Sequence, residues 1–193
     1  MARPRKFDEE RAVDAAMQAF WAAGYEATST QDLCDATGLG RSSIYNTFKS
    51  KHDLFHRALL RYMERKSDTL GELLEGDLPA RERLRALLDV IIEEECAPAD
   101  AARGCMVVNT AVELAARDAD VARELEQDYG RRFEALRAVI EAGQRDGDID
   151  SAKDARDLAH FVIAAIGGMR VSARVGIGRE ALQGIARATL DAL

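Results

Sequence analysis

The spacing of apolar residues is the feature that most limits what this chain can fold into. They recur three and four residues apart along almost the whole sequence, and its only three prolines are Pro4, Pro79 and Pro98. This period places apolar side chains on one side of a helix, whereas a half-buried strand needs strict alternation. The sequence therefore predicts an all-α fold. Glycines separate the periodic runs, at the places where helices end: Gly24, Gly38, Gly76, Gly104, Gly147, Gly176 and Gly178.

The first four expected helices are short or begin with clear start signals. One begins near Asp8, whose side chain can cap the first turn. The next follows Ser29, because Ser29 and Asp32 have the spacing of a capping box, and it ends at Gly38. A third runs from Gly40 or Arg41 to about Phe48. Lys49, Ser50 and Lys51 then form a tight connection to a fourth, which carries Leu54 and extends past Arg65. The later expected helices are longer, and their ranges are 81–96, 105–116, 121–143, 153–175 and 179–193.

Residues 30–48 have the form of a helix-turn-helix, in which the second helix enters the major groove of DNA. Leu33, Leu39, Ile44 and Phe48 can anchor both helices to the first one. That arrangement leaves a run of polar side chains facing outward: Arg41, Ser42, Ser43, Tyr45, Asn46 and Thr47. Arginine can bind guanine and asparagine can bind adenine through paired hydrogen bonds. Short helices alone do not exclude an ordinary three-helix subdomain with a polar surface.

The charge is unevenly distributed along the chain. The formal net charge is −7, yet residues 1–66 contain eleven Lys and Arg against nine Asp and Glu. A local surplus of positive charge is what binding to phosphates requires. Lys49 and Lys51 follow the expected recognition helix. Arg3, Arg5 and Lys6 form a basic N-terminal arm that could enter a minor groove.

Residues 7–60 together resemble the N-terminal pattern of the TetR family of transcriptional regulators. The resemblance rests on residues in three groups: Ala15, Ala16, Phe20, Gly24, Tyr25 and Thr28; Gly38, Leu39, Ser43, Ile44 and Tyr45; and Phe48, Lys51 and Leu54. The chain departs from the family pattern at Gly40, Ser42, Lys49 and Cys34.

The resemblance implies a DNA-binding domain over residues 1–52 and an effector-binding and dimerisation domain over residues 53–193. It implies a homodimeric repressor that a small-molecule effector releases from double-stranded operator DNA. The two recognition helices of such a dimer lie about 34 to 36 Å apart when the half-sites are one helical turn apart. By the same resemblance, Arg41 and Asn46 read bases, Tyr45 and Lys51 bind phosphates, and Ser29 or Thr30 anchors the preceding helix to the DNA backbone.

The last two expected helices carry wide apolar stripes, and the resemblance places the dimer interface there. Ala164, Ala165, Gly167 and Gly168 make a flat patch that permits close helix approach. A monomer could bury part of each stripe internally. We expect the interface to include Phe161, Val162, Ala165, Ile166, Leu182, Ile185 and Leu190.

An effector pocket is expected between packed helices of the second domain, because helical proteins form ligand sites there. Its candidate lining residues are Cys105, Met106, Asn109, Glu113, Tyr129, Phe133, Phe161 and Met169. Each alone is more often a core residue than a ligand contact. Asn109 and Glu113 are the most informative, because they lie four residues apart in an otherwise apolar stretch and so share one helix face.

The segment from Gly104 to Ala111 resembles a TetR subgroup that includes the N-ethylmaleimide reductase repressor. The resemblance makes Cys105 a candidate thiol that reacts with electrophiles, since a thiol at a helix start can have a lowered pKa. The alternative is a small buried core residue. Cys34 and Cys96 are expected to be structural, and three irregularly spaced cysteines indicate neither a disulfide framework nor a paired zinc motif.

An enzyme is the main alternative class, and the sequence gives it little support. His52 and His56 have the spacing of a metal pair on a helix, but no third ligand is evident and we expect both to be exposed. The run Glu93–Glu95 is expected to be a solvated helix face. No metal and no cofactor are expected. Another alternative is a ligand sensor that no longer binds DNA, which the outward polar residues of 41–51 argue against.

The expected location is the cytoplasm. The longest apolar run, from Phe161 to Met169, is much shorter than the roughly 20 residues that cross a bilayer. The N-terminus has basic residues but no apolar stretch of the kind found in a secretory signal.

Overall fold

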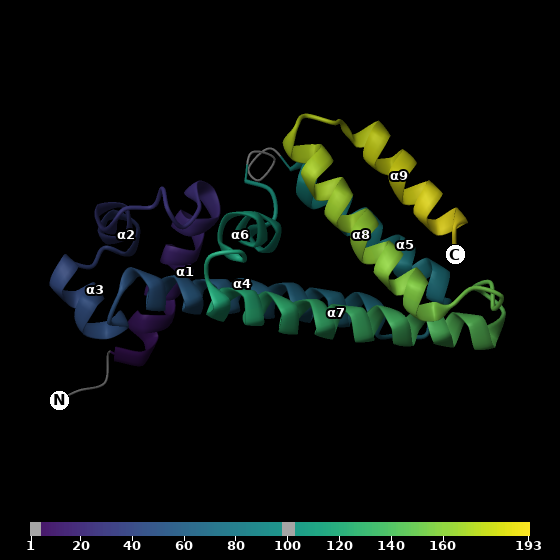
Figure 1. Ribbon diagram of the computed structural model, residues 1–193, viewed down its shortest axis with the longest axis horizontal. Coiled ribbons are helices and arrows are strands. Elements are labelled where there is room, and N and C mark those ends of the chain that lie inside the picture. Colours follow the sequence, from purple (N-terminus) through teal and green to yellow (C-terminus); the bar gives the residue numbers. More distant parts are fainter. Residues whose placement is uncertain (1–4, 98–102) are drawn as a thin grey trace. The chain divides into compact units, whose positions relative to one another are not determined.

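The computed structural model describes residues 5–97 and 103–193, with side chains from residue 9 onward. Within these ranges every regular element is an α-helix, so the predicted all-α class is confirmed (Figure 1). The helices are α1 (Arg5–Ala23), α2 (Thr30–Thr37), α3 (Arg41–Phe48), α4 (Lys51–Leu74), α5 (Ala80–Cys96), α6 (Met106–Leu114), α7 (Ala119–Asp146), α8 (Ala155–Arg174) and α9 (Arg179–Asp191).

The chain forms two compact units, and each is built from segments distant in the sequence. Of the described residues, the first unit contains 5–65 and 105–125, and the second contains 66–97, 103–104 and 126–193. The boundary between them falls inside α4 and inside α7. These units are defined by packing. The functional division at residue 52 stays a prediction.

Aromatic and aliphatic side chains of α1 to α4 form the core of the first unit, and α6 packs against the same core. The rings of Phe20 and Phe55 meet edge to face with their centroids 5.1 Å apart. Leu33, Ile44 and Phe48 are each at most 1% exposed. Burying a side chain of this size contributes about 1.5 to 3 kcal/mol. The burial of these three side chains therefore holds α2 and α3 against the rest of the unit.

The start and end of α2 are set by local side-chain chemistry, as the sequence predicts. The Ser29 hydroxyl accepts from the Asp32 amide at 3.1 Å, and the Asp32 carboxylate accepts from the Ser29 amide at 2.7 Å. Gly38 ends the helix with φ +68°, a left-handed conformation that glycine adopts without strain. The predicted capping box is therefore confirmed.

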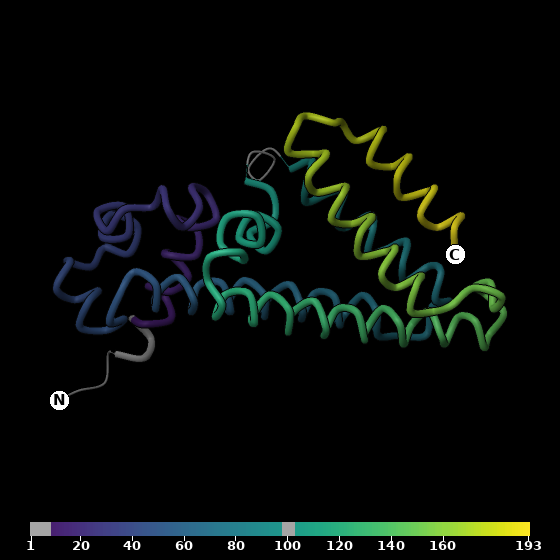
Figure 2. Tube along the Cα trace, viewed as in Figure 1, coloured from purple at the N-terminus to yellow at the C-terminus, as the bar shows by residue number. Residues whose placement is uncertain are grey.

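In the second unit, α5, α8 and α9 pack on one another (Figure 2). Their common core also includes side chains of α7, and its members include Leu84, Leu88, Ile140, Met169 and Leu182. The second unit also explains why α7 passes Gly143, where we expected it to end, and continues to Asp146. A Cβ atom on Gly143 would lie 2.7 Å from the Ala80 Cβ and 2.8 Å from Ile149. This glycine therefore permits close packing rather than ending the helix.

Two further expectations are wrong. Helix α1 begins at Arg5 rather than near Asp8, so Arg5 and Lys6 belong to its first turn and not to a free arm. Arg3 lies outside the described residues. The acidic run of α5 is solvated only in part: Glu93 is exposed, whereas Glu95 is only 6% exposed and accepts from Arg170 at 2.9 Å. Glu94 pairs with Lys66 at 2.6 Å.

Crossing a bilayer requires a helix that is both long and strongly apolar, and none within 5–97 and 103–193 meets both conditions.

Candidate nucleic-acid interface

The second helix of the expected helix-turn-helix is α3, and its packing leaves one polar face exposed to solvent. Ile44 and Phe48 point into the core from one side of α3. The remaining six residues of this eight-residue helix are all exposed, and they are the six predicted from the sequence: Arg41, Ser42, Ser43, Tyr45, Asn46 and Thr47. Gly40 precedes the helix as its N-cap residue. The arrangement thus presents hydrogen-bonding side chains without an apolar obstruction.

Polar contacts between α2 and α3 hold Tyr45 in place. The hydroxyl groups of Thr30 and Tyr45 are 3.1 Å apart, and the Arg41 guanidinium lies 5.9 Å from the centre of the Tyr45 ring. The hydrogen bond from Thr30, with a smaller contribution from Arg41, lowers the pKa of Tyr45. Thr30 therefore positions the Tyr45 hydroxyl at the edge of the exposed face of α3.

Ser29 is occupied by the capping box. Its hydroxyl lies 2.6 Å from the Asp32 carboxylate, and this contact lowers the pKa of Asp32. The side chain of Ser29 is exposed, but it already has a structural role at the start of α2. The Ser29 hydroxyl is therefore less available to DNA than that of Thr30.

Lys49 and Lys51 flank the turn after α3. Lys49 is exposed and has φ +55° and ψ −47°, and the Ser50 amide donates to the Phe48 carbonyl across it. This is a γ-turn with positive φ, which is strained for any residue with a side chain. Lys51 lies 4.5 Å from the centre of the Tyr25 ring, and its Nζ is 3.5 Å from the Glu26 carbonyl. Burial raises the pKa of Tyr25, and Glu26 adds to the effect.

Glu113 has a structural role in the first unit that the sequence did not reveal. Its carboxylate accepts from the backbone amides of Tyr25, at 3.0 Å, and Glu26, at 2.8 Å. The same carboxylate lies against Gly24, where a Cβ atom would be 2.9 Å from it. Glu113 therefore ties α6 to the connection between α1 and α2. Its expected role in lining a pocket stays a prediction.

Cys105, Met106 and Asn109 also belong to the first unit. Cys105 is 7% exposed, Met106 is 2% exposed, and both pack in the core of that unit. The Tyr62 hydroxyl of α4 donates to the Cys105 Sγ at 3.7 Å. The sequence analysis did not single out Tyr62, since no local pattern links residues 43 positions apart.

The other four expected pocket residues lie in the second unit. Met169 is fully buried and Phe133 is 9% exposed, whereas Tyr129 and Phe161 are 37% and 45% exposed. His160, which sequence reasoning missed, stacks on Phe133 with ring centroids 4.4 Å apart, and its Nδ1 is 2.6 Å from the Tyr129 hydroxyl. The eight expected lining residues are thus divided between the two units, and an effector pocket stays a prediction.

The expected interface residues fall into two groups. Val162, Leu182 and Leu190 are at most 3% exposed within one chain. They are therefore core residues of the second unit and are not accessible to another subunit. Phe161 is exposed, and Ala165, Ile166 and Ile185 are partly buried. Apolar side chains at the end of α8 and beyond it are also exposed, namely Val171, Val175 and Ile177.

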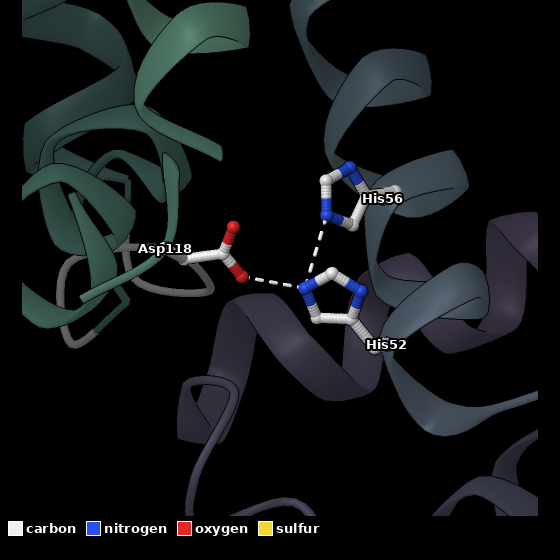
Figure 3. A group of neighbouring side chains, drawn as sticks. All are labelled: His52, His56 and Asp118. Carbon is white, nitrogen blue, oxygen red and sulfur yellow. Dashed lines mark hydrogen bonds and ion pairs between the residues drawn. The ribbon is translucent and has the colours of Figure 1, made fainter. Parts of the chain in front are cut away.

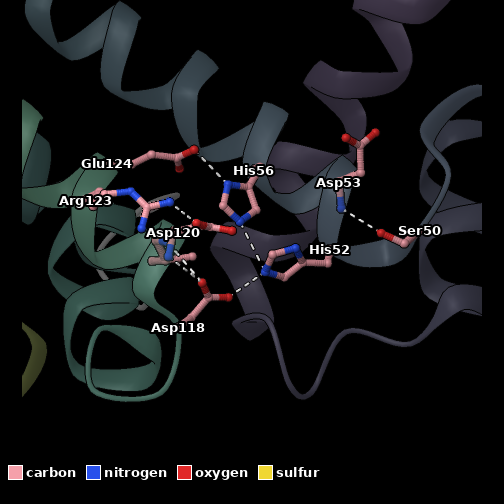
Figure 4. A network of polar contacts seen from close by, with 9 residues as sticks. Ser50, His52, Asp53, His56, Asp118, Asp120, Arg123 and Glu124 are labelled. Atoms are coloured by element: carbon pink, nitrogen blue, oxygen red, sulfur yellow. Dashed lines mark hydrogen bonds and ion pairs between the residues drawn. The ribbon is translucent and has the colours of Figure 1, made fainter.

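We expected His52 and His56 to be exposed, but both are partly buried. Each histidine contacts a carboxylate: His52 contacts Asp118, which precedes α7, and His56 contacts Glu124 within α7 (Figure 4). The hydrogen bond with His52 lowers the pKa of Asp118. Sequence reasoning missed both carboxylates, because they lie 66 and 68 positions away along the chain.

Comparison with protein families decides what this helix-turn-helix belongs to. Residues 12–58 match the tetR family of bacterial regulatory proteins, and residues 80–189 match the tetracyclin repressor-like C-terminal domain. The chain belongs to the TetR family. It is therefore a DNA-binding transcriptional regulator and not an enzyme, and its TetR helix-turn-helix contains α2 and α3.

Similar proteins of known sequence and structure agree with the TetR assignment. The transcriptional repressor ComR of Escherichia coli (strain K12) is 34% identical over 188 residues, which cover 97% of this chain and 90% of ComR. The repressor DhaR of Mycobacterium sp. (strain GP1) is 28% identical over 184 residues, which cover 94% and 89%. A cysteine mutant of the TetR regulator CifR, solved with 26-bp double-strand operator DNA, has a TM-score of 0.86 at 30% identity, with 99% of each chain covered.

Proposed function

We propose that this TetR regulator is a homodimeric repressor that binds an operator through α3 and leaves it when a small-molecule effector binds. The observation that carries the proposal is the exposed polar face of α3, on a fold shared with CifR, whose structure contains operator DNA. We place its action in the cytoplasm, where an operator is accessible.

Within α3, two side chains are suited to reading bases. Arg41 can donate two hydrogen bonds to the acceptors of guanine, and Asn46 can pair with adenine in the same way. Both are exposed and neither is covered by the core of the first unit. We therefore assign sequence discrimination to Arg41 and Asn46.

Phosphate binding is assigned to residues at the edge of α3. Tyr45 presents a hydroxyl held by Thr30, and Lys49 and Lys51 bring positive charge next to the helix. Such contacts position the protein but carry no sequence information. Each neutralised phosphate also makes affinity more sensitive to salt.

The proposed dimer forms through the outer face of α8. Phe161 and Val171 are 45% and 52% exposed, and Ile166 between them is partly buried, so apolar area remains uncovered in a single chain. Ile166→Asp is expected to shift the protein to a monomer in sedimentation at micromolar concentration. Leu190→Asp is not a useful test, since Leu190 is in the core and its replacement would unfold the second unit.

Operator binding is tested by footprinting and mobility shift with the DNA upstream of the protein's own gene. We expect protection of two half-sites and loss of protection in Ile166→Asp, with an affinity that falls steeply as salt rises. Failure of the wild-type dimer to prefer this DNA over a scrambled sequence, at any salt concentration, would contradict the proposal.

The proposed effector must bind the non-DNA-binding conformation better, by about 5 kcal/mol for a nearly complete switch. One specific observation favours a covalent form of this switch, in which Cys105 reacts with an electrophile. Its thiol lies at the start of α6 and accepts a hydrogen bond from Tyr62.

The covalent switch has a direct test. Cys105→Ser is expected to keep operator affinity and to lose release by quinones or N-ethylmaleimide. Cys34→Ser and Cys96→Ser serve as matched controls and should respond as the wild type does. Normal release of Cys105→Ser by these electrophiles would exclude the covalent switch and leave reversible effector binding.

A further inference from the structure

Two histidines and an aspartate in the first unit point their ligand atoms at one another (Figure 3). His52 Nε2 lies 2.5 Å from the Asp118 Oδ2 and 3.1 Å from the His56 Nε2. All three atoms lie within 4.8 Å of one another. The histidines occupy successive turns at the start of α4, and Asp118 precedes α7. The cluster therefore joins two segments distant in sequence.

Hydrogen bonding prepares the His56 ring for a metal. Its Nδ1 lies 2.7 Å from the Glu124 carboxylate, which can only accept, so Nδ1 carries the proton. In the neutral ring, Nε2 then presents its lone pair toward His52 and Asp118. A carboxylate behind a histidine in this way is the usual second partner of metal-bound imidazole. Glu124 thus sets both the tautomer and the direction of the ring.

Asp118 can bind a metal without giving up its structural role. Its Oδ1 accepts from the amides of Asp120 and Val121 at 3.0 and 3.1 Å and so caps the first turn of α7. Its Oδ2 faces His52 and is the atom that belongs to the cluster. The capping bonds fix the carboxylate in place, which lowers the entropy lost on binding.

The size and composition of the cluster favour a transition metal. Ligand atoms around tetrahedral Zn²⁺ are about 3.3 Å apart when Zn–N bonds are about 2.0 Å. His52 Nε2 and Asp118 Oδ2 would need to separate by roughly 1 Å, a movement within the reach of side-chain rotation. Two imidazoles and a single carboxylate suit Zn²⁺ and its neighbours, whereas Ca²⁺ and Mg²⁺ require mostly oxygen ligands. His52 is 40% exposed and gives an ion access from solvent.

We propose that His52, His56 and Asp118 bind a divalent transition metal of the zinc class, with a water molecule in the fourth position. On binding, the ion replaces the proton shared within the cluster, and that proton passes to solvent. The metal then bonds the first two turns of α4 to the segment before α7. Only Lys49 and Ser50 separate α4 from the recognition helix α3, so occupancy stiffens the support of the DNA-binding face. This effect on DNA rests on the proposed operator binding, whereas the site itself does not.

The test is a Zn²⁺ titration of the full chain without a polyhistidine tag, in competition with a chromophoric chelator. We expect one ion per chain. His56→Ala should weaken the affinity by ~100-fold or more, and Glu124→Gln by ~10- to 100-fold, which is the usual cost of losing a second partner. Asp118→Asn keeps the cap of α7 and should still weaken the affinity, since an amide oxygen is a poorer zinc ligand than a carboxylate.

His160→Ala is the matched control, because His160 is the third and last histidine of the chain and lies in the second unit. Its affinity for Zn²⁺ should equal that of the wild type. Co²⁺ should give the visible spectrum of nitrogen and oxygen ligands, without a thiolate charge-transfer band. Three results would each overturn the site. They are the absence of stoichiometric Zn²⁺ binding, a thiolate charge-transfer band with Co²⁺, and a double variant His52→Ala/His56→Ala that binds Zn²⁺ as tightly as the wild type does.

Operator binding with and without Zn²⁺ separates the two proposals. The coupling is supported if Zn²⁺ changes the operator affinity of the wild type, in either direction, and leaves the operator affinity of His56→Ala unchanged. Zinc binding without any change in operator affinity overturns the coupling and leaves the site. A protein that binds Zn²⁺ as expected but has no operator preference contradicts the proposed function and not the metal site.

Discussion

Glu113→Ala is expected to destabilise the first unit by about 2 to 4 kcal/mol. The wild-type carboxylate accepts from the amides of Tyr25 and Glu26 at 3.0 and 2.8 Å. Hydrogen bonds to a charged group contribute about 1.5 to 3 kcal/mol each. The Glu26 amide is exposed and regains a water partner, so its share falls below that range, to about 0.5 to 1 kcal/mol. The Tyr25 amide is partly buried and remains unpaired, so its share stays at about 1.5 to 3 kcal/mol.

Urea unfolding followed by far-UV circular dichroism measures this loss, at equal subunit concentration for all variants. The midpoint of Glu113→Ala should fall without a change in slope. Val112→Ala on the same helix is the control, because Val112 is 85% exposed and should change stability by less than about 0.5 kcal/mol. A Glu113→Ala protein as stable as the control, but with an altered effector response, would refute the structural role and restore Glu113 to a pocket.

Three further predictions concern backbone strain, close packing and a buried charge. Lys49→Gly should raise stability by about 1 kcal/mol, because glycine adopts a positive φ without strain. The same change should weaken DNA binding, because it removes a positive charge. Thermal unfolding should therefore show a higher melting temperature, and a mobility shift should show a lower affinity for DNA. Gly143→Ala should lower stability by about 1 to 3 kcal/mol in the same thermal assay, because its Cβ would contact Ala80 and Ile149. Burial raises the pKa of Glu95 above its usual value, so the folded state binds a proton on this carboxylate more tightly than the unfolded state does. At neutral pH the carboxylate is ionised, and its burial therefore lowers the stability of the folded state. The stability of Glu95→Gln relative to wild type should therefore be highest near pH 7 and fall as the pH approaches 4.5 in urea unfolding, and a constant difference would contradict this.

The features predicted from the sequence are those set by neighbours along the chain. Ser29 and Asp32 are three residues apart, and Gly38 ends the same helix, so turn chemistry alone located α2. The exposed face of α3 followed from the positions of Ile44 and Phe48 within one helical period.

The features that escaped prediction depend on residues brought together by the tertiary fold. Glu113 meets Tyr25 across 88 positions, and Asp118 meets His52 across 66. No local spacing encodes such pairs. Similarly, a wide apolar stripe does not show which of its members face the core of their own chain. Leu190 and Phe161 belong to comparable stripes, yet one is 3% and the other 45% exposed.

The assignment of base reading to α3 is tested most directly by operator discrimination in point variants. Affinities for the native and a scrambled operator are measured for Arg41→Ala, Asn46→Ala and Lys51→Ala at several salt concentrations. Arg41→Ala and Asn46→Ala should each lose about 1 to 3 kcal/mol of discrimination. Lys51→Ala should weaken both DNAs alike and reduce the salt slope by about 1. Full discrimination retained in both Arg41→Ala and Asn46→Ala would contradict the account, because bases would then be read by another part of the protein.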